Sequence, residues 1–218
     1  MESSQPRNMG NKINRNSQSA SIGLIVRQKE PKVLETPLDR LDSFLTPNEL
    51  FYIRSHAPAP KLDITSYRLQ IDGAVRNPLS LTYQQLRDAP AESRTAILEC
   101  AGNSRVFLVP SVQGAQWELG AVGNAEWTGV LLSVLLERAG LEDDACEIVL
   151  EGPDRAIPKE GVVPPGRICY ARSLTRAKAL QPDVLIAYQM TAVILPLITD
   201  TRCVQSFRAT TQWLQLSG

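Results

Sequence analysis

The sequence has little of what several classes of metalloprotein need. It contains one histidine, His56, and four cysteines, none of which stands in a Cys-x-x-Cys pair. These counts exclude a multi-histidine metal site, and the cysteine spacing matches neither a zinc ribbon nor a ferredoxin-type cluster. Four cysteines in 218 residues is also well below the density of a disulfide scaffold, so we expect reduced thiols. A functional cysteine must therefore be argued for from its own surroundings.

The sequence also lacks a surplus of charge and a long apolar run. Its 23 Lys and Arg residues balance its 23 Asp and Glu residues, whereas nucleic-acid binding by bulk charge draws on an excess of Lys and Arg. No apolar run reaches the roughly 18 residues that indicate a transmembrane helix. We therefore expect no nucleic-acid partner and no membrane span. The composition, 43% hydrophobic and 21% charged, is that of a folded globular protein.

Residues 1–22 contain few large apolar side chains and are rich in Ser, Asn and Gln. Such a segment cannot offset its ordering entropy by burial, so we expect a disordered N-terminal tail. A secretory signal peptide needs an apolar stretch of about 7–15 residues, and this tail has neither that stretch nor a twin-arginine pair. The expected compartment is the cytoplasm, or the periplasm if the true start lies upstream.

The periodicity of the remaining chain predicts an α+β fold. Residues 67–73 alternate apolar and polar side chains, which is typical of a strand, and residues 94–100 predict a buried strand. Thr82 is expected to cap a short helix. The clearest helix is predicted over 127–139, ended by Gly140. Because the strands and helices follow no strict βαβ rhythm, we expect mixed β-sheets.

The stretch of residues 99–105, ECAGNSR, carries the strongest chemical signal. Cys100 follows the predicted strand and precedes a turn with Gly102, a residue type that lets backbone approach a ligand closely. Arg105 lies five residues further on, and nearby positive charge favours a thiolate. On these residues alone, a structural cysteine beside a tight turn is the simpler interpretation.

A set of short motifs in a specific order changes that interpretation. In this order and spacing the chain resembles the molybdopterin-binding domain of the sulfite oxidase family, which also includes assimilatory nitrate reductases. The resemblance covers about residues 34–190. The motifs are FYIRSHAP at 51–58, ECAGNSR at 99–105, GAQW at 114–117, AEWTG at 125–129, LEGPD at 150–154, YARS at 170–173 and LIAYQM at 185–190.

The resemblance implies a role for each matching residue. Cys100 matches the thiolate that binds molybdenum, and thiolate is a soft ligand that suits a soft, redox-active metal. Arg54 and Arg105 match arginines near the substrate oxyanion, since guanidinium groups present fixed donor forks to oxygen atoms. Trp117 matches a tryptophan that lines the same pocket. The residues matched to contacts with the molybdenum–molybdopterin cofactor are Tyr52, Ile53, Arg54, Ser55, His56, Cys100 and Asp154.

Several of these residues have a plainer interpretation when each is taken alone. His56 would more often be an ordinary loop histidine, and Asp154 a turn residue. Trp117 and Trp127 would more often belong to the hydrophobic core, and we assign Trp127 to the core. Ser104 stands where the family commonly has another arginine.

By this resemblance the protein is an oxidoreductase that oxidises sulfite to sulfate by oxygen-atom transfer. One histidine cannot supply both axial ligands of a b-type haem, so electrons would pass to an external acceptor such as a cytochrome c. Two alternatives remain open. The chain could act on another oxyanion, as a nitrate reductase-like member of the same family, or it could be an inactive fragment that binds no cofactor.

The chain departs from the family pattern after Met190. The family continues with an Asn-Gly segment, then His-Gly-[Phe/Tyr]-Pro-x-Arg, Val-Pro-Gly and Ser-Val-Lys-Trp, whose basic residues hold the pterin phosphate. Here residues 191–203 read TAVILPLITDTRC. If one nucleotide is missing just after the Met190 codon, residues 191–194 permit Asn-Gly-Gly-Asp and residues 199–204 permit His-Gly-Tyr-Pro-Leu-Arg. The other two motifs then also fall in order, at 207–209 and 215–218.

We therefore expect three parts: a disordered tail at 1–22, a molybdopterin-binding domain at 23–190, and a frameshifted tail at 191–218. The fold would then be the sulfite-oxidase type of molybdopterin-binding domain, incomplete at its C-terminus. The family's C-terminal dimerisation domain is expected to be absent. An authentic but divergent C-terminus is the rival interpretation of residues 191–218.

Overall fold

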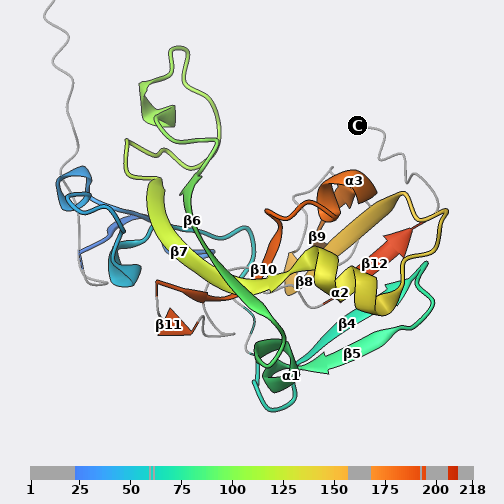
Figure 1. The fold of residues 1–218 in the computed structure, drawn as a ribbon. Helices are drawn as coiled ribbons and strands as arrows, with labels where there is room; N and C mark the ends of the chain where they lie inside the picture. The colour runs from blue at the N-terminus through green and yellow to red at the C-terminus, as the bar shows by residue number, and fades with distance from the viewer. Residues whose placement is uncertain are drawn as a thin grey trace, which may run out of the picture.

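The computed structural model describes residues 23–58, 60, 62–156, 168–191, 193–194 and 206–210. These residues form three β-sheets joined by short helices (Figure 1). One sheet contains both parallel and antiparallel pairs, because β12 runs parallel to β4 and antiparallel to β8. The predicted α+β class with mixed sheets is confirmed.

The first sheet is built from the N-terminal part of the described chain. It has the order β1-β2-β3, with β1 at Ile25–Gln28, β2 at Val33–Glu35 and β3 at Ile53–Arg54. All three residues of β2 are buried. Two single-turn 3-10 helices, Leu38–Arg40 and Asn48–Leu50, lie between β2 and β3.

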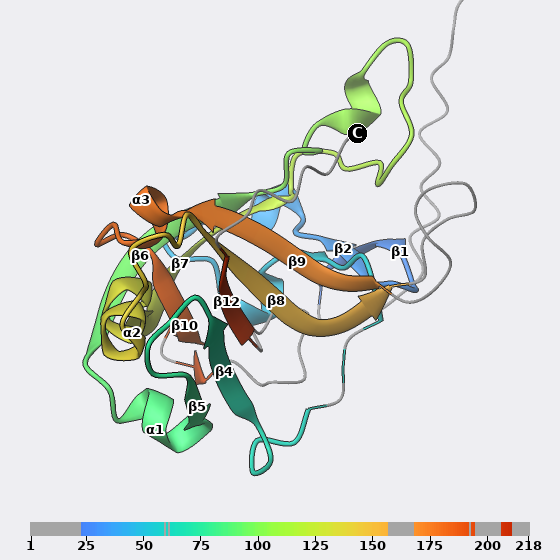
Figure 2. The same cartoon turned by 90° about the vertical axis from the view of Figure 1, so that its right-hand side faces the viewer.

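The second sheet has the order β11-β10-β7-β6 and is dominated by a long hairpin. Its strands are β6 at Ala91–Glu99, β7 at Val122–Leu131, β10 at Leu185–Met190 and β11 at Val193–Ile194. Strands β6 and β7 pair along their whole length, from Ala91↔Val130 to Glu99↔Val122. The hairpin loop, residues 100–121, projects from the body of the molecule (Figures 1 and 2).

The third sheet has the order β5-β4-β12-β8-β9 and carries most of the core on one face. Its strands are β4 at Arg68–Gly73, β5 at Leu79–Thr82, β8 at Glu147–Ala156, β9 at Ile168–Thr175 and β12 at Ser206–Thr210. The helices are α1 at Tyr83–Arg87, α2 at Leu132–Ala139 and α3 at Arg176–Ala179. Apolar residues of α2 pack with β4, β7 and β10 into one cluster, which joins the second and third sheets.

Two local sequence signals are confirmed, one for the start of a helix and one for the end of another. Thr82 caps α1 in a capping box: its Oγ1 accepts from the Gln85 N–H at 3.1 Å, and the Gln85 side chain accepts from the Thr82 N–H at 2.9 Å. Gly140 ends α2 with φ of +69°, the left-handed conformation that glycine adopts without strain. Among the described residues, no helix is both long enough and apolar enough to cross a bilayer.

Two sequence predictions about the long hairpin were wrong. The helix expected at 127–139 begins only at Leu132, because residues 122–131 are held in β7 by pairing with β6 on one side and β10 on the other. Trp127 therefore lies in a strand, where its ring packs against Phe51 and Met190. The strand expected to be buried at 94–100 is β6, and all nine of its residues are exposed. Among the described residues it is the edge strand of its sheet, and none of its side chains belongs to one of their hydrophobic clusters, so both of its faces are open to solvent.

Candidate functional site

Cys100 stands at the base of the projecting loop, directly after β6. Its N–H donates to the Ala121 carbonyl at 2.9 Å, and its own carbonyl accepts from the Asn103 N–H at 2.8 Å. The side chain is half-buried and packs against a small cluster around Val33 and Trp117. The backbone on both sides of the thiol is thus fixed by hydrogen bonds, while the side chain keeps access to solvent.

Trp117 is fully buried in the same cluster. Its ring meets the ring of Tyr52 edge to face, with centroids 6.0 Å apart. Its Nε1–H has no hydrogen-bond partner among the described residues. Burying an indole N–H without an acceptor costs free energy, so this position is suited to a ligand that supplies one.

Arg105 begins a single-turn 3-10 helix, Arg105–Phe107, within the loop. Its guanidinium lies between two glycines, where a Cβ on Gly102 would be 2.7 Å from Nη2 and a Cβ on Gly114 would be 1.9 Å from Nη1. Arg105 Nη1 also donates to the Ala115 carbonyl at 3.5 Å. Glycine at both positions leaves room for the guanidinium, and a Cβ at either one would make it shift.

The segment 52–56 reaches the site along β3, which pairs with β2 through Val33↔Arg54 and Leu34↔Ile53. The Arg54 Nη2 lies 3.4 Å from His56 Nδ1, and Arg54 Nη1 donates to the Ser55 carbonyl. His56 is exposed and Ser55 is buried. Tyr52 alone of this segment is placed in the cluster that contains Cys100 and Trp117.

Asp154 falls in β8 of the third sheet, where its backbone pairs with no residue of the loop that holds Cys100. Its side chain lies outside the described part of the chain, so its matched cofactor contact stays a prediction. Among the described residues, no group of three or more His, Cys, Asp and Glu gathers to hold a metal ion. The match of Cys100 to a molybdenum ligand therefore stays a prediction.

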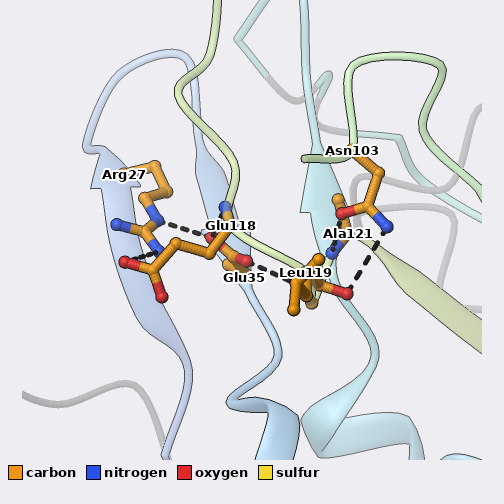
Figure 3. A network of polar contacts seen from close by, with 7 residues as sticks. Arg27, Glu35, Asn103, Glu118, Leu119 and Ala121 are labelled. Atoms are coloured by element: carbon orange, nitrogen blue, oxygen red, sulfur yellow. Dashed lines mark hydrogen bonds and ion pairs between the residues drawn. The ribbon is translucent and has the colours of Figure 1, made fainter. Parts of the chain in front are cut away.

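Sequence reasoning missed the residues that hold the second half of the loop in place (Figure 3). Glu35 accepts hydrogen bonds from the N–H groups of Glu118 and Gly120, at 3.2 and 2.8 Å. The Asn103 side chain accepts from the Ala121 N–H at 3.1 Å and donates to the Leu119 carbonyl at 3.4 Å. A glutamate inside the apolar run VLET at 33–36 was the available signal, because a carboxylate is seldom buried without a partner.

The fold and this loop define a class of protein: an α+β domain that presents a half-buried cysteine thiol beside a buried tryptophan and a glycine-enclosed arginine. The sequence model of the oxidoreductase molybdopterin binding domain matches residues 56–198. Sulfite oxidase of Gallus gallus is 38% identical over 180 residues, which cover 80% of this chain and 38% of that protein. The chain therefore belongs to the oxidoreductase molybdopterin-binding domain family.

Other relatives agree with this assignment. Sulfite oxidase of Arabidopsis thaliana is 36% identical over 180 residues, 77% of this chain and 44% of that protein. Nitrate reductase [NADH] of Ulva prolifera is 35% identical over 161 residues, 71% of this chain and 18% of that protein. The sulfane dehydrogenase SoxCD from Paracoccus pantotrophus shares the fold, with a TM-score of 0.68 and 23% identity over 92% of this chain and 50% of that one.

The chain spans 38% of the Gallus gallus protein and 44% of the Arabidopsis thaliana protein. The residues present nevertheless fit a molybdenum–molybdopterin cofactor. Cys100 offers a soft sulfur ligand, Arg105 offers a positive charge, and the buried Trp117 N–H has no acceptor within the described part of the chain. These donors match the needs of a metal bound to an anionic ligand.

Proposed function

We propose that this chain is the cofactor-binding part of an oxidoreductase that transfers an oxygen atom to sulfite, giving sulfate, and passes electrons to an external acceptor such as a cytochrome c. The observation that carries the proposal is the half-buried Cys100 thiol packed beside the buried Trp117, whose N–H has no partner among the described residues. Two relatives that are each 38% identical are named sulfite oxidases, and the nitrate reductase of Ulva prolifera is 35% identical, which favours sulfite over nitrate.

Each residue of the site has a distinct task in this proposal. The bound molybdenum–molybdopterin cofactor supplies the redox chemistry and the transferable oxygen. Cys100 supplies the thiolate ligand, and its hydrogen bonds to Ala121 and Asn103 hold the backbone on both sides of it. Arg105 and Arg54 orient the sulfite oxyanion through charge-assisted hydrogen bonds. Trp117 and Tyr52 close one side of the site with apolar surface.

The first test is the molybdenum content of the purified chain, measured by inductively coupled plasma mass spectrometry. We expect molybdenum in the wild type and its loss in Cys100→Ala, because removal of the thiolate removes a metal ligand. The matched control is Cys146→Ala, because Cys146 lies just before β8 and away from the loop. This variant should keep the metal. Equal molybdenum in Cys100→Ala and the wild type would contradict the proposal.

The second test is the substrate. Sulfite-dependent reduction of ferricyanide or cytochrome c by metal-loaded protein is the expected activity. Nitrate reduction by reduced viologen, without sulfite oxidation, would support the nitrate reductase-like alternative instead. Protein that folds but takes up no molybdenum would support the inactive fragment.

We further propose that residues 191–218 arise from a frameshift after Met190. Residues 193–194 and 206–210 nevertheless pair into the second and third sheets as β11 and β12. One feature of the described backbone supports this proposal. Thr191 follows β10 in the tight connection to β11, where Met190 pairs with Val193, and its φ is +45°. A β-branched residue seldom adopts that conformation, whereas an Asn-Gly pair is favoured in two-residue hairpin turns. The shifted reading frame places Asn-Gly at 191–192.

The frameshift is tested by resequencing the locus and by restoring the frame. We expect genomic DNA to contain the displaced His-Gly-Tyr-Pro-Leu-Arg reading and the frame-restored protein to hold more molybdenum per chain, since the motif's basic residues add charge-assisted contacts to the pterin phosphate. Genomic DNA without that reading would overturn the proposal. Equal molybdenum in the two versions would show that the tail does not matter for cofactor binding.

A further inference from the structure

Glu35 is a buried carboxylate outside the set of residues matched to the cofactor. Its side chain is 1% exposed, at the end of β2. Arg27, on β1, donates from Nε to Glu35 Oε2 at 2.5 Å. The other donors to the carboxylate are the N–H groups of Glu118 and Gly120. A buried charge is stable only when such donors satisfy it. Glu35 therefore holds the Arg27 side chain and the two loop N–H groups close to one another.

Two of these donors belong to residues 117–121, which we call the return segment because it leads the loop back to β7. Backbone hydrogen bonds join each end of this segment to another residue of the loop. The Trp117 carbonyl accepts from the Val106 N–H at 3.1 Å, and the Ala121 carbonyl accepts from the Cys100 N–H at 2.9 Å. Whatever sets the path of the return segment therefore sets the spacing between the Trp117 ring and the Cys100 thiol.

The N-terminal sheet meets the return segment directly at Gly120. The Thr36 N–H donates to the Gly120 carbonyl at 3.2 Å, and a Cβ on Gly120 would lie 1.7 Å from the Thr36 carbonyl oxygen. The two backbones are thus in contact with no side chain between them, and the Glu35 carboxylate completes the junction (Figure 3). The Arg27 guanidinium spans it as well, since its Nη2 lies 3.2 Å from Glu118 Oε1.

We propose that Glu35 is a positioning residue for the molybdenum site: it holds the return segment so that Cys100 and Trp117 keep their relative places. Its part in the reaction rests on the proposed function, but the positioning itself can be measured on the chain's own thiol, with or without metal. Glu35→Gln keeps the size of the side chain and removes its charge. The amide presents one oxygen where two N–H groups now donate to a carboxylate, so the return segment loses a charge-assisted hydrogen bond.

The experiment measures the rate at which iodoacetamide alkylates Cys100, followed by mass spectrometry, with Cys146 in the same molecule as the internal reference. In Glu35→Gln we expect Cys100 to react about tenfold faster, the change that follows from losing one hydrogen bond to a charged group, while Cys146 is unchanged. Glu118→Gln is the matched control. The Glu118 side chain is 50% exposed, so its ion pair with Arg27 contributes little and Cys100 should react as in the wild type.

A loss of stability alone must be separated from positioning. Leu86→Ala removes a core side chain on α1, far in the fold from the loop, and lowers global stability. If Cys100 reacts as fast in Leu86→Ala as in Glu35→Gln at equal stability, or if Glu35→Gln leaves the rate unchanged, the positioning role is overturned. If Glu35→Gln does not fold, hydrogen exchange on the wild type decides. The N–H groups of Glu118 and Gly120 should then exchange as slowly as that of Cys100, and rapid exchange at those two positions overturns the inference.

The two hypotheses fail in different ways. A wild-type chain that binds no molybdenum contradicts the proposed function and leaves the thiol measurement valid. A wild-type chain that binds molybdenum, with Cys100 equally reactive in the wild type and Glu35→Gln, contradicts only the role of Glu35. When both hold, Glu35→Gln also contains less molybdenum than Glu118→Gln, because the thiolate ligand is no longer held in place.

Discussion

At the scale of single residues, the candidate site depends on glycines, because a residue without a side chain lets a neighbouring group come close. Gly102 and Gly114 leave the room that the Arg105 guanidinium occupies, and Gly120 leaves room for the Thr36 carbonyl. Each of these glycines is needed for a close approach. In two of the three cases the neighbour is the arginine matched to the substrate oxyanion, so the steric requirement and the proposed chemistry coincide.

Gly114→Ala tests the placement of Arg105. The new Cβ would meet Nη1 at 1.9 Å, so the guanidinium must move, and we expect the KM for sulfite in metal-loaded protein to rise by about tenfold or more. Gly114 also has φ of +125°, which costs an alanine of order 1–3 kcal/mol in stability. Gly140→Ala is the control for a positive φ alone: its φ is +69°, and a Cβ there would come no closer than 3.5 Å to any atom beyond its chain neighbours.

Both variants should lower the thermal unfolding midpoint, and only Gly114→Ala should raise KM. The same KM in both variants would show that Arg105 does not hold the substrate.

Thr191→Asn tests the backbone strain after β10. Asparagine tolerates the left-handed region better than a β-branched residue, and the Thr191 Oγ1 is buried with no hydrogen-bond partner among the described residues. We expect the unfolding free energy to rise by about 1 kcal/mol, measured by urea denaturation. Thr95→Asn, at an exposed position in β6, is the control and should give no gain, since asparagine is unfavourable in strands. A loss of stability in Thr191→Asn would argue against strain at this turn.

At the scale of elements, polar contacts between nearby residues connect helix α3 to the strands before and after it. Helix α3 is capped by Thr175, the last residue of β9, whose side chain accepts from the Lys178 N–H. The Lys178 ammonium then donates to both carboxylate oxygens of Asp183, at 2.9 and 2.7 Å, just before β10 begins. Two local interactions thus hold the connection from β9 through α3 to β10: the Thr175 cap at its start and the Lys178–Asp183 ion pair near its end.

The Lys178–Asp183 pair predicts a specific response to acid. The hydrogen bond from Lys178 lowers the pKa of Asp183 below its ordinary value. A carboxyl whose pKa is lower in the folded state stabilises the fold above its unfolded pKa, about 4, and loses that contribution as the pH falls through the folded pKa. As the pH is lowered from 6 through the pKa of the folded state, the free energy of unfolding should therefore fall less in Asp183→Asn than in the wild type. Urea denaturation at each pH measures this difference. Asp144→Asn, at an exposed carboxyl, is the control, and equal acid sensitivity in Asp183→Asn and the wild type would contradict the assignment.

At the scale of the whole molecule, the long β6–β7 hairpin joins the body of the domain to the site. The body is a continuous core shared by the second and third sheets, α1 and α2. The loop beyond it exposes several large apolar side chains, and Ile97 in β6 is 67% exposed. The exposed large apolar residues of the loop are Val106, Phe107, Leu108, Val109, Val112 and Leu119. Glu35 and Thr36 tie the base of the loop to the N-terminal sheet, and Asn103 joins its two ends, which is where Cys100 lies.

The predictions from sequence succeeded where the physical cause is local. The Thr82 capping box and the Gly140 helix end depend on residues within a few positions of each other. The strand over 67–73 followed from alternation along a single segment, and it is found as β4. The motif order, which identified the family, is likewise a property of the chain read in one direction.

The tertiary structure decided what depends on distant partners. Trp127 lies in a strand because β6 and β10 pair on both sides of it, and β6 is exposed because no hydrophobic cluster of the described residues covers either of its faces. The partners of Glu35 could not be assigned from sequence, since the N–H groups from which it accepts hydrogen bonds are more than eighty residues away. The amino-acid sequence by itself determined the family, the α+β class and the cysteine that carries the proposed chemistry. The fold decided which residues hold that cysteine in place, because hydrogen bonds between distant segments exist only once the sheets have formed.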